Sequence, residues 1–405
     1  MSIFDSSKRS VLIKNRNILQ STYIPDQLPH RESEISSIVE IITPALSKNK
    51  PSNILVTGKT GTGKTAVLNY IGKELMKEDP EQKNCIFVYV NCEIVDNTYG
   101  ILFNISNQII IDKNNKIPFT GWSIDRVYDT IINSIDKENK IFIIVLDEID
   151  RILQKSDDIF YFLTTMNEVL KQSKVSIIGV TNNTRFTELL TPRIKSRLGE
   201  EKVIFSPYKT EQLQDILKKR AELAFEPEIL EDAVIPYCAA LSAQDSGDAR
   251  KALDLLRVSA EIAERRCDST ITEAHVMSAR NSIEKDAVVE VIKTLPVQPK
   301  IVLRSIIEIH ESGDTIITTG EVYSTYKEMC NILSVNASKE KMVANHISEL
   351  DMLGMIHAIV KSFGRNGRTR EIELNINKDI IDFIKKDELF EPLLKHKSIR
   401  QTKLL

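Results

Sequence analysis

The sequence predicts an α/β domain built on a parallel sheet, then an all-helical domain, then a C-terminal winged-helix domain. In the first half of the chain, short aliphatic runs typical of strands alternate with helix-like segments, as expected of a doubly wound α/β domain. From about residue 209 to residue 290, the spacing of apolar residues is helical almost throughout. Beyond residue 299, three helical segments precede two short strands, and this combination predicts a winged helix-turn-helix.

The strands of the α/β domain are continuous aliphatic runs, of which Ile141–Leu146 is the longest. Such runs are typical of strands that are buried on both faces of a parallel sheet. Apolar residues at helical spacing, such as Leu68, Ile71 and Leu75, indicate the helices between them. The expected strands are 53–56, 85–90, 141–146, 175–180 and 203–205, and the expected helices include 65–78 and 160–170.

The end of the all-helical part is indicated by Pro296 and Pro299, which we expect to bracket a linker because each proline stops a helix. Beyond them we expect helices at about 299–311, 319–331 and 338–353, and strands at about 355–361 and 370–376. The predicted division is an N-terminal tail (1–20), the α/β core (21–208), the helical domain (209–294), the winged-helix domain (295–392) and a C-terminal tail (393–405).

Composition excludes several classes of protein. The chain has 405 residues, of which 42% are hydrophobic and 27% charged, as is ordinary for a globular protein with sizeable cores. No aliphatic run approaches the ~20 residues of a membrane helix, and no signal peptide is apparent. Five scattered cysteines form neither a disulfide framework nor a metal-binding pair. We therefore expect a cytoplasmic protein, and the net charge of −3 means that any DNA-binding surface is local.

One motif predicts a phosphate site. The run Gly58-Lys59-Thr60-Gly61-Thr62-Gly63-Lys64-Thr65 fits the P-loop (Walker A) pattern at every fixed position, and it follows a predicted strand and opens a predicted helix. Glycines let successive backbone N–H groups face the phosphates at a helix N-terminus. Lys64 can reach the β- and γ-phosphates, and the Thr65 hydroxyl can ligate Mg²⁺. A glycine-rich turn with a chance lysine is the alternative, and both flanks argue against it.

The second half of this site is predicted where the strand Ile141–Leu146 ends in Asp147 and Glu148. Asp147 lies at the carboxyl edge of a central strand, where it can hold Mg²⁺ through water, and Glu148 can polarise an attacking water. Acidic residues also cap strand ends without any catalytic role, but the neighbouring phosphate motif favours the catalytic interpretation. We therefore expect ATP to be bound and hydrolysed with Mg²⁺.

Three further features refine this prediction. Asn182 follows the strand 175–180 and could orient the attacking water, although an Asn after a strand is often a turn residue. Arg193 and Arg197 precede the last strand, where an arginine can reach a neighbouring subunit's γ-phosphate, although a solvated basic turn is the plainer alternative. Arg250 lies near a helix start, which cations ordinarily avoid. An anion in front of it would remove this anomaly, so Arg250 is a candidate γ-phosphate sensor.

Together these residues resemble the AAA+ superfamily and, more narrowly, its archaeal replication initiators of the origin-recognition/Cdc type. The resemblance extends over about residues 15–375, and the motifs occur in the family's order. The strings that carry it are Tyr23–Glu32 (YIPDQLPHRE), Thr191–Gly199 (TPRIKSRLG), Phe205–Tyr208 (FSPY) and Gly247–Arg257 (GDARKALDLLR). It implies an AAA+ core, a helical lid and a winged helix.

The resemblance also implies roles for individual residues. Asn182 matches sensor one and Arg250 sensor two, and of the two candidate arginine fingers we favour Arg197 over Arg193. The family's insertion after the second strand contacts the DNA minor groove, but its counterpart here, residues 95–112, contains no arginine or lysine. Its role in DNA binding is therefore left open. The implied nucleotide contacts are Ile24 and Pro25 near the adenine, Gly58, Gly61, Thr62, Gly63, Lys64 and Thr65 at the phosphates, and Tyr208 and Arg220 from the lid.

The winged-helix part offers candidate DNA contacts. Residues 361–370 contain Lys361, Arg365, Arg368 and Arg370 and no acidic residue, as suits a wing that follows phosphates or enters a minor groove. The second helix of a helix-turn-helix reads the major groove, and the outward residues of the helix 338–353 include Lys339, Lys341 and Asn345. Winged helices also serve as protein-docking modules, and Glu340 and Glu349 weaken this helix as a reader of DNA, but DNA binding is the expected role.

The expected function is an ATP-switched initiator of DNA replication. It would bind double-stranded origin DNA and recruit the replicative MCM helicase, and a paralogous initiator could complete its ATP site. Hydrolysis should be slow, because the arginine finger must come from another protomer. The expected location is the cytoplasm, at the nucleoid. The alternatives are an ATP-dependent transcriptional regulator and a clamp-loader-like remodelling ATPase, and the basic wing argues against the latter.

Overall fold

The structure is a computed structural model that describes residues 12–95, 97–110, 116–153, 158–312, 317–362 and 368–393. The chain divides into two compact units, one up to Ala279 and the other from Arg280 onward. This division falls within helix α12 (Glu273–Thr294), and each unit is described by itself. Within the described ranges, no helix is both long enough and apolar enough to cross a membrane.

The first unit is built on a five-stranded sheet in the order β2-β3-β4-β1-β5, and every pairing is parallel. β3 lies near the centre and is buried along its whole length, which explains its unbroken aliphatic sequence. The carboxyl ends of β1, β3 and β4 therefore share one edge of the sheet, and the predicted parallel sheet is confirmed. The strands are β1 (Ile54–Gly58), β2 (Cys85–Asn91), β3 (Ile141–Asp147), β4 (Lys174–Thr181) and β5 (Glu201–Phe205).

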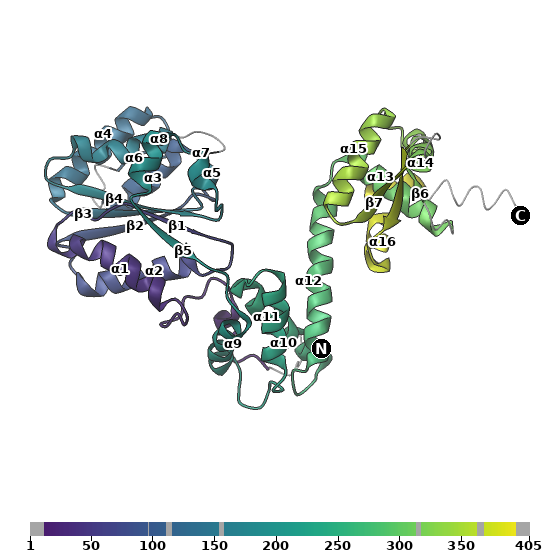
Figure 1. Ribbon diagram of the computed structural model, residues 1–405, viewed down its shortest axis with the longest axis horizontal. Coiled ribbons are helices and arrows are strands. Elements are labelled where there is room, and N and C mark those ends of the chain that lie inside the picture. The colour runs from purple at the N-terminus through teal and green to yellow at the C-terminus, as the bar shows by residue number, and fades with distance from the viewer. Residues whose placement is uncertain are drawn as a thin grey trace, which may run out of the picture. The chain divides into compact units, whose positions relative to one another are not determined.

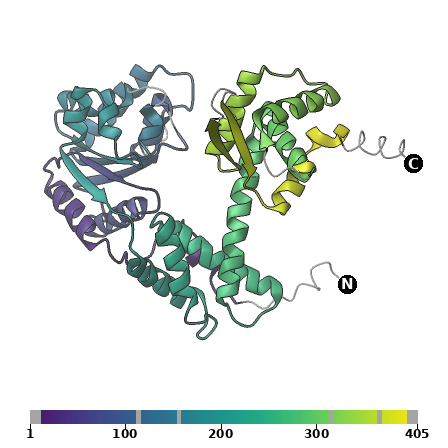
Figure 2. The ribbon, with the colours of Figure 1, turned by 45° about the vertical axis from the view of Figure 1, so that its right-hand side comes forward.

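Helices cover both faces of this sheet. Figure 1 shows α1 and α2 on one face and α3, α4 and α6 on the other, and Figure 2 shows the same layers from a second side. The helices of this domain are α1 (Glu32–Ile42), α2 (Lys64–Glu78), α3 (Thr98–Ile109), α4 (Ile124–Glu138), α5 (Asp150–Leu153), α6 (Asp158–Val169), α7 (Phe186–Leu189) and α8 (Pro192–Leu198), with a short 3₁₀ turn at η3 (Thr43–Ser47). A second 3₁₀ turn, η2 (Arg16–Leu19), packs in the core of the helical lid.

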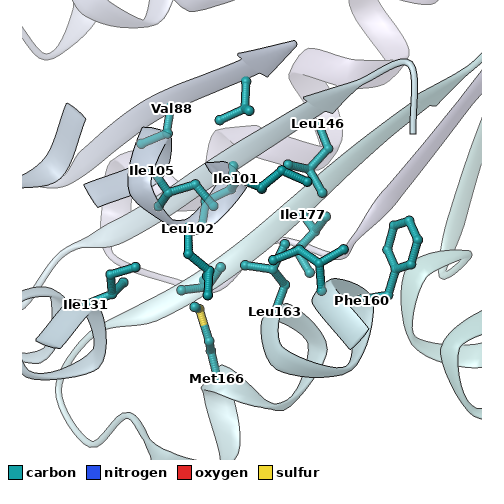
Figure 3. Packing of buried hydrophobic residues seen from close by; sticks show 14 of the residues in the cluster. Val88, Ile101, Leu102, Ile105, Ile131, Leu146, Phe160, Leu163, Met166 and Ile177 are labelled. Atoms are coloured by element: carbon teal, nitrogen blue, oxygen red, sulfur yellow. The ribbon is translucent and has the colours of Figure 1, made fainter. Parts of the chain in front are cut away.

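Side chains of β3 alternate between the two cores. Ile144 and Leu146 belong to the cluster under α3, α4 and α6, whereas Ile143 and Val145 belong to the cluster under α1 and α2. Figure 3 shows the first cluster, in which residues of α3 and α6 meet the sheet. Helix α3, which occupies the place of the family's insertion, is thus an integral part of this core.

The helical lid consists of α9 (Thr210–Ala224), α10 (Val234–Asp245), α11 (Ala249–Arg266) and the beginning of α12. Residues of the expected N-terminal tail pack into it, because Leu12, Ile13, Ile18 and Leu19 are buried in the lid core. The carboxylate of Glu264, 3% exposed, accepts hydrogen bonds from the backbone nitrogens of Leu12 (2.9 Å) and Ile13 (3.1 Å). A buried carboxylate is stable only with such donors, so this segment is structurally part of the lid from Leu12 on.

The second unit is a winged helix. Its core joins Ile292 of α12 to Ile306, Tyr326 and Ile347 of the three following helices, and its antiparallel sheet has the order β6-β8-β7. The predicted three helices and β-hairpin are present, and β6 and α16 are additions. The elements are α13 (Val297–Glu311), β6 (Ile317–Thr318), α14 (Thr319–Ile332), α15 (Glu340–Met352), β7 (Ile356–Ser362), β8 (Arg368–Leu374), α16 (Lys378–Lys385) and η6 (Glu388–Phe390).

The prediction of a linker at residues 295–299 is wrong. Helix α12 continues to Thr294, Pro296 is the N-cap of α13, and Pro299 lies in the first turn of α13. The first turn is the part of a helix where a missing N–H removes no hydrogen bond. Here the prolines therefore begin a helix instead of separating two domains.

Candidate functional site

The glycine-rich loop lies between β1 and α2 and is covered by the lid. Gly61 (φ 72°) and Gly63 (φ 91°) have left-handed backbones, which residues with a side chain rarely adopt. A Cβ on Gly61 would lie 1.7 Å from Oδ1 of Asp248, and one on Gly63 would lie 2.7 Å from the Tyr208 hydroxyl. The backbone nitrogen of Ala249 also donates to the Gly61 carbonyl (3.1 Å). Both glycines are thus required by conformation and by the close approach of the lid.

Lys64 begins α2 and points back into the loop. Its Nζ donates to the carbonyls of Gly58 (2.7 Å) and Lys59 (2.8 Å) and to Oδ1 of Asn182 (2.7 Å). The residue is 6% exposed, and burial lowers the pKa of its ammonium to about 8, although the Asp147 carboxylate opposes this shift. An anionic phosphate near Nζ would favour the charged form, so the loop suits a phosphorylated ligand.

The next residue, Thr65, meets Asp147 at the end of β3. The Thr65 hydroxyl donates to Oδ2 of Asp147 (2.7 Å), and the hydroxyl of Tyr89 on β2 donates to the same oxygen (2.6 Å). Mg²⁺ is usually bound by one or two carboxylates together with substrate phosphates. One hydroxyl and one carboxylate, adjacent to a phosphate loop, therefore fit Mg²⁺ bound together with a nucleotide.

Glu148 and Asn182 lie beside this pair. Glu148 has a left-handed backbone (φ 57°), and such strain in a residue with a side chain often marks a functional position. Burial, followed by the charges of Glu93 and Asp147, raises the pKa of the Glu148 carboxyl. Nδ2 of Asn182 donates to Oε1 of Glu148 at 3.4 Å, so Asn182 contacts both Glu148 and Lys64.

A cavity of ≈ 800 Å³ opens in front of these residues. Ile24, Pro25, Tyr208, Arg220 and Arg250 line it together with the loop, Asp147, Glu148 and Asn182. Two predicted contacts, Gly58 and Thr62, lie outside this lining. The Gly58 carbonyl accepts from Lys64, and the fully buried Thr62 donates its hydroxyl to the Lys59 carbonyl (2.8 Å). These two residues therefore stabilise the conformation of the loop without lining the cavity.

Arg220 of the lid holds the N-terminal segment at the rim of the cavity. Its guanidinium donates to the carbonyls of Ile18 (3.0 Å) and Tyr23 (3.1 Å) and lies 4.6 Å from the centre of the Tyr23 ring. Burial lowers its pKa. Arg220 therefore positions the segment that carries Ile24 and Pro25, in addition to lining the cavity itself.

Sequence reasoning missed Arg31, which links the loop to the lid. Its guanidinium, 3% exposed, donates to the carbonyls of Thr62 (2.9 Å) and Ser206 (2.6 Å) and to the Tyr208 hydroxyl (3.0 Å). It also pairs with Glu34 (2.6 Å). A single arginine has no spacing signature, and the only available signal was its place in the string 23–32.

Neither candidate arginine finger lines this cavity. Both lie on α8, where Arg193 is exposed beside the ring of Tyr161, 5.2 Å from its centre. Arg197 pairs with Glu168 of α6 and donates to the Thr164 carbonyl (3.2 Å). Their action on a neighbouring subunit stays a prediction.

The predicted DNA contacts are distributed over α15 and β8. Lys339 is the N-cap of α15, and Lys341 and Asn345 are exposed on it. Arg370 of β8 does not extend freely from the wing, because its guanidinium donates to the Ala344 carbonyl (2.9 Å) and the Ser348 hydroxyl (2.6 Å) of α15. Arg365 lies outside the described residues, and for Arg368 the structure describes only the backbone, in β8.

Comparison with known proteins assigns each part of the chain. Residues 54–206 match the model of the ATPase family associated with various cellular activities (AAA). Residues 214–281 match the Cdc6 AAA+ ATPase-type lid domain, and residues 290–384 match the CDC6 C-terminal winged-helix domain. The predicted order of an AAA domain, a lid and a winged helix is thereby confirmed.

Full-length relatives agree with these domain matches. The ORC1-type DNA replication protein of Pyrococcus abyssi is 47% identical over 96% of this chain and 93% of its own length, and ORC1-type DNA replication protein 1 of Methanosarcina mazei is 47% identical over 90% and 88%. Among solved structures, the Aeropyrum pernix ORC1 protein in complex with DNA is 41% identical, with a TM-score of 0.78 over 95% of this chain and 99% of that one. Identity at this level over nearly the whole length shows that the chain belongs to the archaeal ORC1-type DNA replication proteins.

Proposed function

We propose that this protein is an ATP-dependent initiator of DNA replication, which binds double-stranded origin DNA and recruits the replicative MCM helicase. ATP binding and slow hydrolysis would be the switch. One observation carries the proposal: the phosphate loop, the Thr65–Asp147 pair and Arg250 of the lid surround a single cavity. They do so in a chain that is 41% identical to an ORC1 protein solved in complex with DNA.

The nucleotide site has a role for each residue. Thr65 and Asp147 would hold Mg²⁺, which when bound neutralises charge on the phosphate oxygens. Lys64 would face the β- and γ-phosphates. Glu148 would accept a proton from the attacking water, and its raised pKa makes the carboxylate a stronger base. Asn182, which contacts both Lys64 and Glu148, would orient that water.

The switch would act through the start of α11. Asp248 caps this helix and lies against Gly61, while the Ala249 nitrogen donates to the Gly61 carbonyl. Arg250 follows on the same turn and lines the cavity. A ligand shifts a conformational equilibrium only by its differential affinity for the two states. An interaction between Arg250 and a γ-phosphate, which ATP offers and ADP does not, would supply that difference to the lid.

The position of α8 supports the proposal that hydrolysis is slow. Arg193 and Arg197 do not line the cavity of their own chain, so the transition-state arginine would come from a second protomer or a paralogous initiator. An arginine supplied in trans is worth roughly 10³–10⁵ in kcat in related phosphoryl-transfer enzymes. An isolated protomer should accordingly hydrolyse ATP slowly and remain in the ATP state.

DNA would be bound by the winged helix. Lys339, Lys341 and Asn345 are available at the start of α15, the part of a recognition helix that faces base edges. Arg370 ties β8 to α15 and would set the direction in which the wing leaves the sheet. Arg365 and Arg368 on that wing would contact phosphates or the minor groove.

The test is selection from sheared genomic DNA of the source organism by the purified protein with ATP, followed by sequencing of the retained DNA. We expect one or a few intergenic loci that coincide with the peak of replication-associated copy number. Purified MCM helicase should then be retained on such DNA only with this protein and ATP, and the Lys64→Ala variant is the matched control. Enrichment spread over many promoters would instead favour a transcriptional regulator.

A further inference from the structure

We propose that Tyr89 is a positioning residue for the Mg²⁺ ligand Asp147 and thereby sets the affinity of the site for the metal. The inference rests on the proposed Mg²⁺–ATP site and goes beyond it. Nothing in the local sequence of β2 indicates such a role, because Tyr89 lies 58 positions before Asp147 and outside every motif.

Among the residues that the structure describes, three donors orient the Asp147 carboxylate, which is 4% exposed. Oδ1 accepts from the backbone nitrogen of Glu148 (2.9 Å), and Oδ2 accepts from the hydroxyls of Thr65 (2.7 Å) and Tyr89 (2.6 Å). Thr65 is itself the expected second metal ligand, and its hydroxyl oxygen would turn toward the metal. Of the two hydroxyls, that of Tyr89 would then keep Oδ2 in place while the carboxylate binds the metal.

The Tyr89 hydroxyl can do this because its strand is held on both sides. β3 pairs with β2 so that Asn91 is level with Asp147 and Tyr89 is two residues back. On the free edge of β2, the side chain of Gln108 from α3 binds both backbone groups of Tyr89. The Tyr89 nitrogen donates to Oε1 of Gln108 (3.2 Å), and Nε2 of Gln108 donates to the Tyr89 carbonyl (2.9 Å).

Packing fixes the ring as well. Tyr89 is half-buried against the cluster that contains Val67 and Leu68 of α2. A short bond from a hydroxyl to an ionised carboxylate is among the stronger hydrogen bonds in proteins. Groups that orient a metal ligand in this way typically contribute 10–100-fold to metal affinity or activity. We therefore expect the Tyr89 hydroxyl to contribute a factor of that size to Mg²⁺ affinity. We expect it to contribute nothing to the binding of phosphates by the loop.

The experiment uses Tyr89→Phe, which removes one oxygen atom and keeps the ring. Binding of a fluorescent, non-hydrolysable ATP analogue to the full-length protein is measured in EDTA and over a Mg²⁺ titration, together with the melting temperature. We expect the Mg²⁺ concentration for half-maximal enhancement to rise at least tenfold, with unchanged affinity in EDTA. Tyr128→Phe is the matched control, because the Tyr128 hydroxyl donates to the Phe162 carbonyl at 3.5 Å and not to a predicted metal ligand.

The outcomes separate the inference from the function on which it rests. An unchanged Mg²⁺ midpoint in Tyr89→Phe would overturn the positioning role and leave the proposed nucleotide site intact. Equal losses of affinity in EDTA and in Mg²⁺, with a lower melting temperature, would overturn it in favour of a purely structural role. If the wild-type protein itself bound the analogue equally well in EDTA and in Mg²⁺, the proposed metal site would fail, and this role with it.

Discussion

Nucleotide affinity should fall as the pH rises through 8, because the Lys64 ammonium, which would face the phosphates, is buried. Burial lowers the pKa of Lys64 from its ordinary value of 10.5 to about 8. A bound triphosphate stabilises the charged form, so its binding is coupled to the protonation of Lys64 wherever the free protein has lost that proton. The perturbation is therefore a simple change of pH, with no substitution needed.

The magnitude follows from this pKa. With a value of about 8, roughly three quarters of free molecules carry a charged Lys64 at pH 7.5 and about 3% do so at pH 9.5. If only the charged form binds, affinity should fall about 25-fold over these two pH units, which corresponds to ~2 kcal/mol. A Lys64→Arg variant, which stays charged throughout, should show a flat profile if it binds.

The stability of the free protein should change in the opposite direction. The folded pKa of Lys64 lies below its unfolded value, so the unfolded chain binds more protons between about pH 8 and 10.5. Stability contributed by this group therefore rises with pH across that window.

Titration of a fluorescent, non-hydrolysable ATP analogue from pH 7.5 to 9.5 tests the predicted fall in nucleotide affinity. A pH-independent dissociation constant in the wild-type protein would refute the assignment of Lys64 as a buried ammonium at the phosphate site.

Three further predictions concern the catalytic base, the lid and the wing. Glu148→Gln should leave ATP binding intact and reduce steady-state turnover at least 100-fold, as removal of a general base does; normal turnover would disprove the role of Glu148. Gly61→Ala should weaken nucleotide binding, and the left-handed backbone of residue 61 alone should destabilise the first unit by ~1–2 kcal/mol. The added Cβ would also overlap the Asp248 carboxylate. In thermal melts, Asp248→Ala should therefore be less destabilising in the Gly61→Ala protein than in the wild-type protein. Alanine at Arg365 and Arg368 together should lower DNA affinity and make the slope of log K against log salt shallower by about 0.9 for each phosphate that the wing no longer neutralises; an unchanged slope would mean that the wing does not touch phosphates.

The phosphate loop could be predicted from sequence because its determinants are local. Strand, loop and helix are consecutive from Ile54 to Glu78, and the residues that turn the backbone are themselves the glycines of the motif. The same holds for Asp147 and Glu148, which end a strand that is recognisable by its unbroken aliphatic run. For such features, chemistry and geometry depend on neighbours in the chain.

Prolines show where local reasoning fails. Pro296 and Pro299 predict helix stops, yet they form the N-cap and first turn of α13. Proline is compatible with the end of one helix and with the start of the next, so the residue type alone does not distinguish a linker from a helix N-terminus. The apolar residues on either side of the prolines decide between these two possibilities. Ile292 and Leu295 are buried with residues of α13 in a single core, so the prolines begin a helix within one domain.

The sequence by itself determined the order of domains, the phosphate loop and the acidic strand end, since each depends on residues that are adjacent or regularly spaced. Only the tertiary structure decided that Tyr89 holds Asp147, that Arg31 joins Thr62 to Tyr208, and that Glu264 binds the backbone of Leu12. These partners are separated by up to 252 positions. A buried polar group must find a partner wherever the packed fold supplies one, and no local pattern records where that will be.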